Sequence, residues 1–135
     1  MKEIRVKAVD EELNNVISFV EEQLESVDCA PRIIVQVNIA VEEIFVNIAH
    51  YAYEPETGEA VIRFEFQKEP DAAVITFIDS GKPYNPLEKP DPDVTLSAEK
   101  RQIGGLGIFM VKKSMDDMRY EYSNCRNILT IIKAI

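Results

Sequence analysis

The stretch that decides the fold is PRIIVQVNIAVEEIFVNIAHYA, residues 31–52. Pro31 suits the first turn of a helix, where its missing N–H removes no hydrogen bond. Advancing about 100° per residue, six apolar side chains fall within an arc of roughly 100°, the width of a stripe that faces a core. They are Ile33, Val37, Ala40, Val41, Ile44 and Ile48. Residues 31–52 therefore predict a long helix packed against another layer.

Period-two patterns on both sides of this helix predict the strands of a sheet. Residues 2–9 alternate as a strand, and Asp10 is predicted to cap a first helix that follows them. The apolar positions of that helix follow helical spacing: Leu13, Val16, Ile17, Val20 and Leu24. Residues 59–68 and 72–80 are β-rich runs separated by Glu69-Pro70-Asp71, which is typical of an antiparallel hairpin.

The regular pattern stops after residue 80 and resumes at residue 104. Residues 81–103 carry four of the seven prolines and no sustained periodicity, so a functional loop is expected there. Residues 104–115 predict a helix that begins with glycines, and residues 117–123 and 128–135 predict two closing strands around a turn at 124–127. The order β-α-α-β-β-loop-α-β-β predicts an α+β fold: a two-layer sandwich with helices on one face of a mixed, mostly antiparallel sheet.

The composition is that of one soluble domain. The 135 residues are 46% hydrophobic and 29% charged, so we expect a single domain over residues 1–135. Cys29 and Cys125 lie far apart without a metal-ligand spacing, and no signal peptide precedes them, which favours reduced thiols and a cytoplasmic location. No apolar stretch approaches the roughly 18 to 20 residues of a membrane span, so no membrane partner is expected.

The net charge bears on the choice of partner. Fifteen Lys and Arg against 24 Asp and Glu give a formal charge of −9, and such a chain is repelled by a phosphate backbone. We therefore expect no nucleic-acid partner. The acidic residues are spread through mixed runs that are typical of solvated helix faces, and an acidic patch for a basic protein partner is the alternative.

Three polar side chains of the long helix fall beside its apolar stripe. Glu43, Asn47 and His50 lie within roughly 60° of one another on the helical wheel. An amide oxygen there suits Mg²⁺, and a carboxylate can orient or deprotonate a nucleophile. The alternative is a polar flank with an i,i+4 contact between Glu43 and Asn47. His50, near the helix C-terminus, is already favoured there by the helix dipole.

A second candidate site is the segment Asp79-Ser80-Gly81-Lys82-Pro83, which follows an apolar strand. A carboxylate at the end of such a strand is partly desolvated and needs a donor, such as the exocyclic amine of adenine. Gly81 would let a flat base approach the backbone. The alternative is a strand end followed by an ordinary turn.

The third is Gly104-Gly105-Leu106-Gly107-Ile108 at the start of the last helix. Glycines at a helix N-terminus expose N–H groups that bind phosphate oxygens with help from the helix dipole. The segment is neither a Walker A loop nor a dinucleotide-binding fingerprint, because GxxxxGK[ST] is absent and no strand precedes the glycines. A glycine-rich turn without a ligand is the alternative.

The order of these segments resembles the N, G1 and G2 boxes of the Bergerat-fold (GHKL) ATPases. That superfamily includes gyrase, heat-shock chaperone ATPases, mismatch-repair ATPases and sensor histidine kinases. The stretches VEEIFVNIAHYAY, DSGKPYNPLE and GGLGIFMVKKSMDDMRYEY are most similar to the anti-sigma-factor serine kinases. The resemblance covers essentially the whole chain.

The resemblance implies roles for individual residues. Glu43 matches the catalytic carboxylate and Asn47 the Mg²⁺-ligating amide, while Asp79 would bind the adenine amino group with Gly81 beneath the base. Thr130 resembles the strand threonine that supports the adenine-binding aspartate, or is an ordinary β-branched strand residue. Backbone amides at the phosphates would come from the last glycine box, Gly105, Leu106 and Gly107. Residues 81–103 would form the ATP lid.

The resemblance also implies an activity and partners. Family members bind Mg·ATP, hold a sigma factor and transfer the γ-phosphoryl group to a serine of a STAS-fold antagonist, and homodimers are expected. Kinase members usually carry an arginine where this chain has Ile103, and Arg101 or the neighbouring Lys100 would instead be presented by the lid to the γ-phosphate. The sequence therefore supports two hypotheses: a protein serine kinase, and a nucleotide-gated binding module without phosphotransfer. A sensor histidine kinase is a third and poorer match, because no phosphoacceptor helical domain precedes it.

Overall fold

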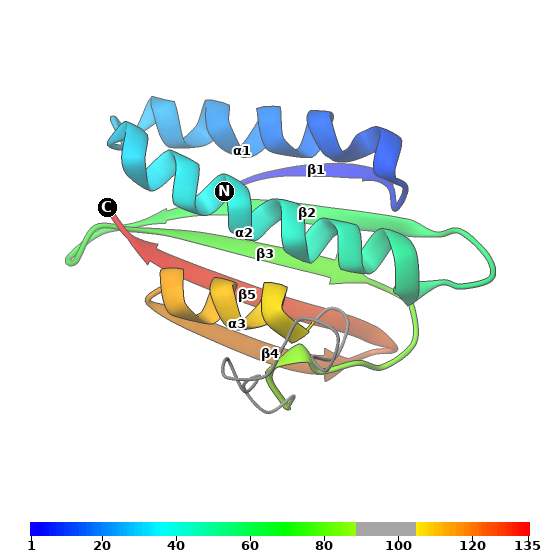
Figure 1. Ribbon diagram of the computed structural model, residues 1–135. Helices are drawn as coiled ribbons and strands as arrows, with labels where there is room; N and C mark the ends of the chain where they lie inside the picture. Colours follow the sequence, from blue (N-terminus) through cyan, green and yellow to red (C-terminus); the bar gives the residue numbers. More distant parts are fainter. Residues whose placement is uncertain (89–104) are drawn as a thin grey trace.

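The computed structural model describes residues 1–88 and 105–135; residues 89–104, and the side chains of 105 and 106, lie outside the description. Five strands form one sheet in the order β1-β2-β3-β5-β4, and each neighbouring pair is antiparallel. Three α-helices lie on one face of this sheet (Figure 1). The α+β prediction is therefore confirmed, with a sheet that is antiparallel throughout the described chain.

The elements agree closely with the sequence pattern, and the main difference lies at the last strand. The strands are β1 (Lys2–Lys7), β2 (Glu59–Gln67), β3 (Ala72–Asp79), β4 (Asp117–Ser123) and β5 (Arg126–Ala134). The helices are α1 (Leu13–Ser26), α2 (Pro31–Asn47) and α3 (Gly105–Ser114), with a π-helical turn at Ile48–Ala52 and short 3₁₀ turns at Asp10–Glu12 and Pro86–Glu88. β5 begins two residues earlier than predicted, which moves Asn127 from the turn into the sheet.

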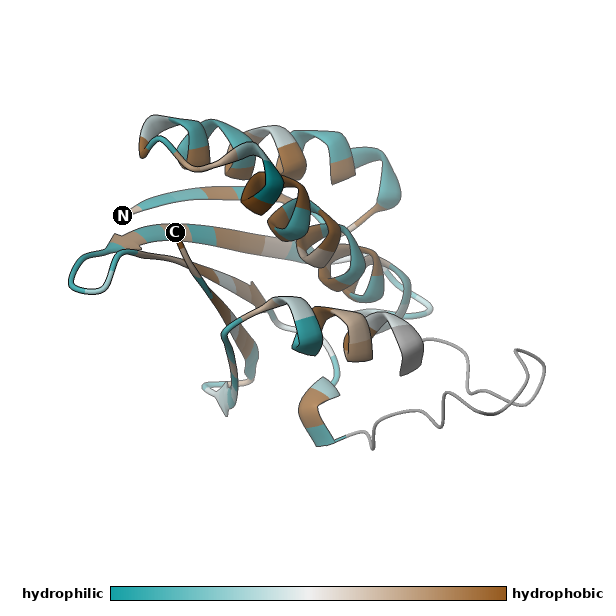
Figure 2. Ribbon diagram, turned by 60° about the vertical axis from the view of Figure 1, so that its left-hand side comes forward, coloured by the Kyte–Doolittle hydropathy of each residue, from teal (hydrophilic) through white to brown (hydrophobic). Residues whose placement is uncertain are grey.

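The core lies between the helices and the sheet. Figure 2 shows that the apolar side of α1 and α2 is turned toward the strands. Four residues of the predicted stripe are buried on α2, together with Phe45, while Ile33 and Ile48 at its ends are partly buried. α1 adds three fully buried side chains: Val16, Val20 and Leu24.

Asp10 does not cap α1 as predicted. The helix begins after the 3₁₀ turn, and no side chain bonds to its first N–H groups. The carboxylate of Asp10 instead lies 2.8 Å from Nε2 of His50. His50 sits in the π-helical turn that follows α2, and its ring bonds to Asp10 and makes no hydrogen bond with Glu43 or Asn47. The prediction that His50 joins those two residues is therefore wrong.

The helical segment Pro31–Ala52 spans 22 residues with a mean hydropathy of 1.4. By length and composition it could cross a membrane, so the expectation that no apolar stretch approaches this length is wrong. Core helices pass the same test. In this fold the buried stripe of α2 packs on the sheet, as the core helix of a globular domain does.

Candidate functional site

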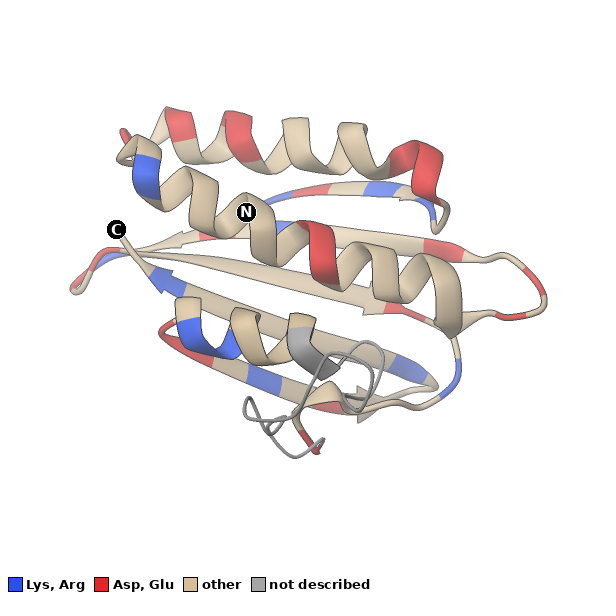
Figure 3. Cartoon of the chain, viewed as in Figure 1, with Lys and Arg blue, Asp and Glu red and all other residues tan. Residues whose placement is uncertain are grey.

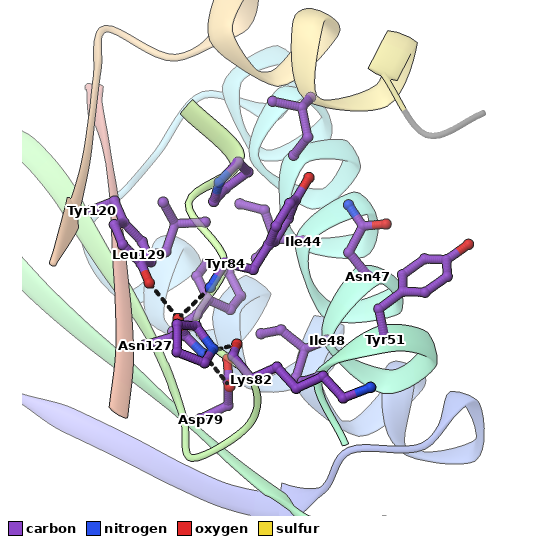
Figure 4. Close-up of a pocket in the computed structure, with 15 residues that line it drawn as sticks. Ile44, Asn47, Ile48, Tyr51, Asp79, Lys82, Tyr84, Tyr120, Asn127 and Leu129 are labelled. Carbon is purple, nitrogen blue, oxygen red and sulfur yellow. Dashed lines mark hydrogen bonds between the residues drawn. The ribbon is translucent and has the colours of Figure 1, made fainter. Parts of the chain in front are cut away.

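A cavity of about 620 Å³ lies between α2, the end of β3 and the strands β4 and β5 (Figure 4). Its volume is in the usual range for small-molecule sites. We call it the main cavity. Its lining residues are Ile44, Asn47, Ile48, Tyr51, Ala52, Phe77, Asp79, Lys82, Pro83, Tyr84, Pro86, Ile108, Tyr120, Asn127 and Leu129. Apolar and aromatic walls with few polar groups suit a flat ligand that has a polar edge.

Asp79 is the buried acid of this cavity, with 6% of its surface exposed. Its Oδ1 accepts hydrogen bonds from the backbone N–H of Gly81 at 2.9 Å and from Nδ2 of Asn127 at 3.0 Å. Its Oδ2 accepts none from any residue in 1–88 or 105–135. Burial raises the pKa of the Asp79 carboxyl, and the hydrogen bonds from Asn127 and Gly81 oppose this effect. Oδ2 is thus available to accept a hydrogen bond from a ligand amine.

Asn127 was missed in the sequence, yet it makes more hydrogen bonds in the main cavity than Asp79. Its Nδ2 donates to Asp79 Oδ1 and, at 2.9 Å, to the carbonyl oxygen of Lys82. Its Oδ1 accepts from the backbone N–H of Tyr84 at 3.1 Å and from the hydroxyl of Tyr120. One buried amide therefore joins the end of β3, the segment after it and strand β4.

Thr130 does not support Asp79, contrary to what the resemblance implied. Neighbouring side chains of a strand point to opposite faces, so Thr130 lies on the side of β5 away from Asn127 and Leu129, which line the main cavity. The hydroxyl of Thr130 lies 3.4 Å from that of Thr76, its register partner on β3. The register partner of Asp79 is Asn127, and Asn127 takes the supporting role.

Gly81 is required by a close backbone approach. A Cβ at this position would collide with the backbone of Ala52, at the end of the π-helical turn. The next residue, Lys82, donates its N–H to the carbonyl of Ala52 at 2.9 Å. The space left by the missing side chain is therefore filled by Ala52, and Gly81 is not among the residues that line the main cavity.

Glu43 and Asn47 lie one turn apart on α2 and contact different parts of the structure. Asn47 lines the main cavity, and its amide makes no hydrogen bond to any residue in the described part of the chain (Figure 4). The carboxylate of Glu43 instead lies against α3, where a Cβ on Gly107 would collide with it. The glycine at position 107 therefore makes room for the carboxylate at the start of α3.

The start of α3 faces the same region. The helix begins at Gly105, and Ile108 in its first turn lines the main cavity. The first N–H groups of a helix have no intrahelical acceptors and attract anions. An anionic group that leaves the main cavity beside Asn47 would thus meet the amides of α3. Arg101, Lys100 and Ile103 lie outside the described residues.

Residues 6–133 match the model of a known family, the histidine kinase-like ATPase domain. The chain belongs to this family. The match indicates that the domain binds ATP, and the main cavity, where Oδ2 of Asp79 is open to an exocyclic amine, is the candidate site. A search of curated proteins finds no match.

The residues of this ATPase domain fit a magnesium ion that is held chiefly by phosphates. Within residues 1–88 and 105–135, no three His, Cys, Asp or Glu side chains gather closely enough to hold a metal by themselves. Mg²⁺ usually keeps several waters and takes one or two protein oxygens besides substrate phosphates. The amide oxygen of Asn47, which has no hydrogen-bond partner among the residues that the structure describes, suits this kind of site.

We expect the Asp79→Asn variant to be as stable as the wild type or more stable at neutral pH. Burial raises the pKa of the Asp79 carboxyl in the folded state above its ordinary value, so the folded protein holds the proton more tightly than the unfolded chain. The contribution of Asp79 to stability is thus present at acid pH and lost as pH rises through the folded pKa. Urea unfolding across this pH range should show that the free energy of unfolding of the wild type increases relative to that of the variant as pH falls. A difference in unfolding free energy that stays constant with pH, or that shifts in favour of the wild type as pH rises, would contradict this prediction.

Proposed function

We propose that this ATPase domain is a protein serine kinase that uses Mg·ATP and acts on a serine of a STAS-fold antagonist, as a regulator that also binds a sigma factor. The observation that carries the proposal is the arrangement of α2: Asn47 faces the main cavity, while Glu43, one turn earlier, lies against Gly107. An adenine in the main cavity would leave its phosphates between these two residues. A homodimer is part of the proposal by family resemblance alone.

Each residue would have a separate task in the transfer. Asp79 Oδ2 would accept a hydrogen bond from the adenine amine, while Asn127 holds Oδ1. Asn47 would hold Mg²⁺, which offsets phosphate charge when bound. The serine oxygen would attack the γ-phosphorus, its proton would pass to Glu43, and ADP would leave. Phosphoryl transfer requires little more than such positioning and charge neutralisation.

The Glu43→Gln variant tests the kinase proposal. A base for the incoming hydroxyl contributes about 10²- to 10⁴-fold to rate, so transfer of γ-labelled phosphate to a STAS-fold protein should fall at least about 100-fold. Glu43 lies outside the lining of the main cavity, and ATP affinity should therefore stay within about 2-fold, below 0.5 kcal/mol. The matched control is Glu42→Gln, because Glu42 is the exposed neighbour on the same helix. Both rates are measured at saturating Mg·ATP.

Ile103, at the position where kinase members carry an arginine, favours a second candidate function. In this alternative, nucleotide controls the binding of a regulatory protein and no phosphate is transferred. Absence of phosphoserine in the wild type, with a Glu43→Gln variant that behaves identically, would reject the kinase and leave the binding module. Equal affinity for a sigma factor with ATP, ADP and no nucleotide would reject the binding module.

A further inference from the structure

The edge strand β4 contributes one hydroxyl group to the polar network of the main cavity. Its charged residues, Asp117, Arg119 and Glu121, alternate with uncharged ones (Figure 3). Because neighbouring side chains of a strand point to opposite faces, Tyr120 lies on the face away from these charges, among the residues that line the main cavity. Its hydroxyl bonds to the amide of Asn127 on β5 (Figure 4).

Two backbone groups fix the orientation of the Asn127 amide. The carbonyl of Lys82 can only accept a hydrogen bond, so it faces Nδ2, at 2.9 Å. The N–H of Tyr84 can only donate, so it faces Oδ1, at 3.1 Å. An amide oxygen only accepts, and the hydroxyl of Tyr120 beside it therefore donates. Burial raises the pKa of this hydroxyl, which thus keeps its proton at neutral pH.

The amide of Asn127 is fully occupied by these contacts. It has two N–H donors and an oxygen with two lone pairs. The donors go to Asp79 Oδ1 and to the carbonyl of Lys82. The oxygen accepts from the N–H of Tyr84 and from the hydroxyl of Tyr120. Asn127 therefore acts on a ligand only through Asp79.

Asp79 presents one oxygen to the main cavity because the other is held. Its Oδ1 accepts from Asn127 and from the N–H of Gly81, while Oδ2 accepts from no residue in 1–88 or 105–135. A hydrogen bond that an amide oxygen accepts polarises the amide and strengthens the bonds that its N–H groups donate. The hydroxyl of Tyr120 therefore strengthens the hydrogen bond from Asn127 to Oδ1.

We propose that Tyr120 is a positioning residue for nucleotide binding: through Asn127 it keeps Oδ2 of Asp79 directed at the exocyclic amine of adenine. This role rests on the proposed function, which takes the main cavity as the adenine site. The apparent affinity for a ligand scales with the fraction of protein molecules in which the binding group is already aligned. One hydrogen bond of ordinary strength changes such a fraction by up to about 5-fold.

The Tyr120→Phe variant removes the hydroxyl and keeps the ring as a wall of the main cavity. Affinity for Mg·ATP, measured by calorimetric titration, should fall about 5-fold. The matched control is Tyr122→Phe. Tyr122 lies opposite Asn127 in the register of β4 and β5, and its hydroxyl makes no hydrogen bond to any other residue that the structure describes. This control should bind Mg·ATP like the wild type.

A double-mutant cycle separates positioning from direct contact with the ligand. In an Asp79→Asn background, Tyr120→Phe should change ATP affinity by less than about 2-fold, because the acceptor that Tyr120 aligns is no longer there. A second measurement needs no nucleotide. The hydrogen bond from Asn127 lowers the pKa of the Asp79 carboxyl, so carbon-13 titration of this carboxyl should give a higher pKa in Tyr120→Phe than in the wild type.

Several outcomes would overturn the proposal. An equal loss of affinity from Tyr120→Phe in both backgrounds would mean that the hydroxyl contacts the ligand itself. An equal loss in Tyr122→Phe would indicate a general effect on β4. If Asp79→Asn weakens ATP binding while Tyr120→Phe changes neither the affinity nor the pKa of Asp79, the role of Tyr120 alone is rejected. ATP affinity unaltered by Asp79→Asn would instead reject the adenine site of the proposed function, and the role of Tyr120 with it.

Discussion

The Asp79→Asn variant should lose ATP affinity by about 100-fold, which corresponds to about 2.7 kcal/mol. The amide keeps an oxygen that can accept from Gly81 and Asn127, as Oδ1 does in the wild type. The variant differs at the position of Oδ2, where an NH₂ group replaces the acceptor oxygen. Both this NH₂ group and the adenine amine are hydrogen-bond donors, so the hydrogen bond between them is lost. Calorimetric titration with Mg·ATP measures the loss directly. Stabilisation of the wild type at ligand 100-fold above its dissociation constant is about 2.7 kcal/mol, and the variant should lose most of it.

Asp71→Asn is the matched control for this experiment. Asp71 is exposed in the turn between β2 and β3, away from the main cavity, so the same chemical change there should leave ATP affinity unaltered. Because Asp79→Asn is expected to fold at least as stably as the wild type at neutral pH, lost binding cannot be attributed to unfolding. ATP affinity within a few fold of wild type would reject Asp79 as the base-binding residue.

The Asn127→Leu variant should be destabilised by about 4 kcal/mol. Leucine has nearly the same shape but removes four hydrogen bonds, each worth about 1 kcal/mol. The variant also removes a donor that holds down the pKa of the Asp79 carboxyl, so that pKa should rise further. Urea unfolding monitored by circular dichroism gives the free energy, and ATP affinity should fall with it.

Asn38→Leu provides a contrasting control on a partly buried amide of α2. The Oδ1 of Asn38 is buried and accepts no hydrogen bond from the residues the structure describes. Replacing an unsatisfied polar group by an apolar one of similar shape is nearly neutral or stabilising. If both variants lost the same free energy, the hydrogen bonds of Asn127 would not be the cause of its effect.

The fold was predictable because its strands and helices carry strong periodic patterns. The stripe of α2 and the hairpin of β2 and β3 lie where their apolar spacing predicted. Asp79 was identifiable for a related reason, since a carboxylate that ends an apolar strand is unusual enough to need a partner. These signals depend on residues that are close together in the sequence, so they can be recognised without knowledge of tertiary contacts.

Other features depend on contacts between distant segments. The pairing of Asp10 with His50 joins residues 40 apart, and the π-helical turn that contains His50 has no sequence signal comparable to an apolar stripe. Asn127 looked like a turn residue because it follows Asn124, Cys125 and Arg126. The register of β5 against β3 sets it opposite Asp79, and that register also assigns Thr130 to the other face.

The contact between residue 81 and Ala52 has a consequence for ligand choice. Because residue 81 has no side chain, the segment after β3 approaches the π-helical turn that follows α2 closely enough to form a main-chain hydrogen bond with Ala52. Asp79 and Asn47, which would bind opposite ends of a nucleotide, therefore lie on two segments that are joined by a backbone hydrogen bond. This contact restrains the separation of the two side chains, and a molecule whose amine and anionic group lie too close together is not expected to reach both.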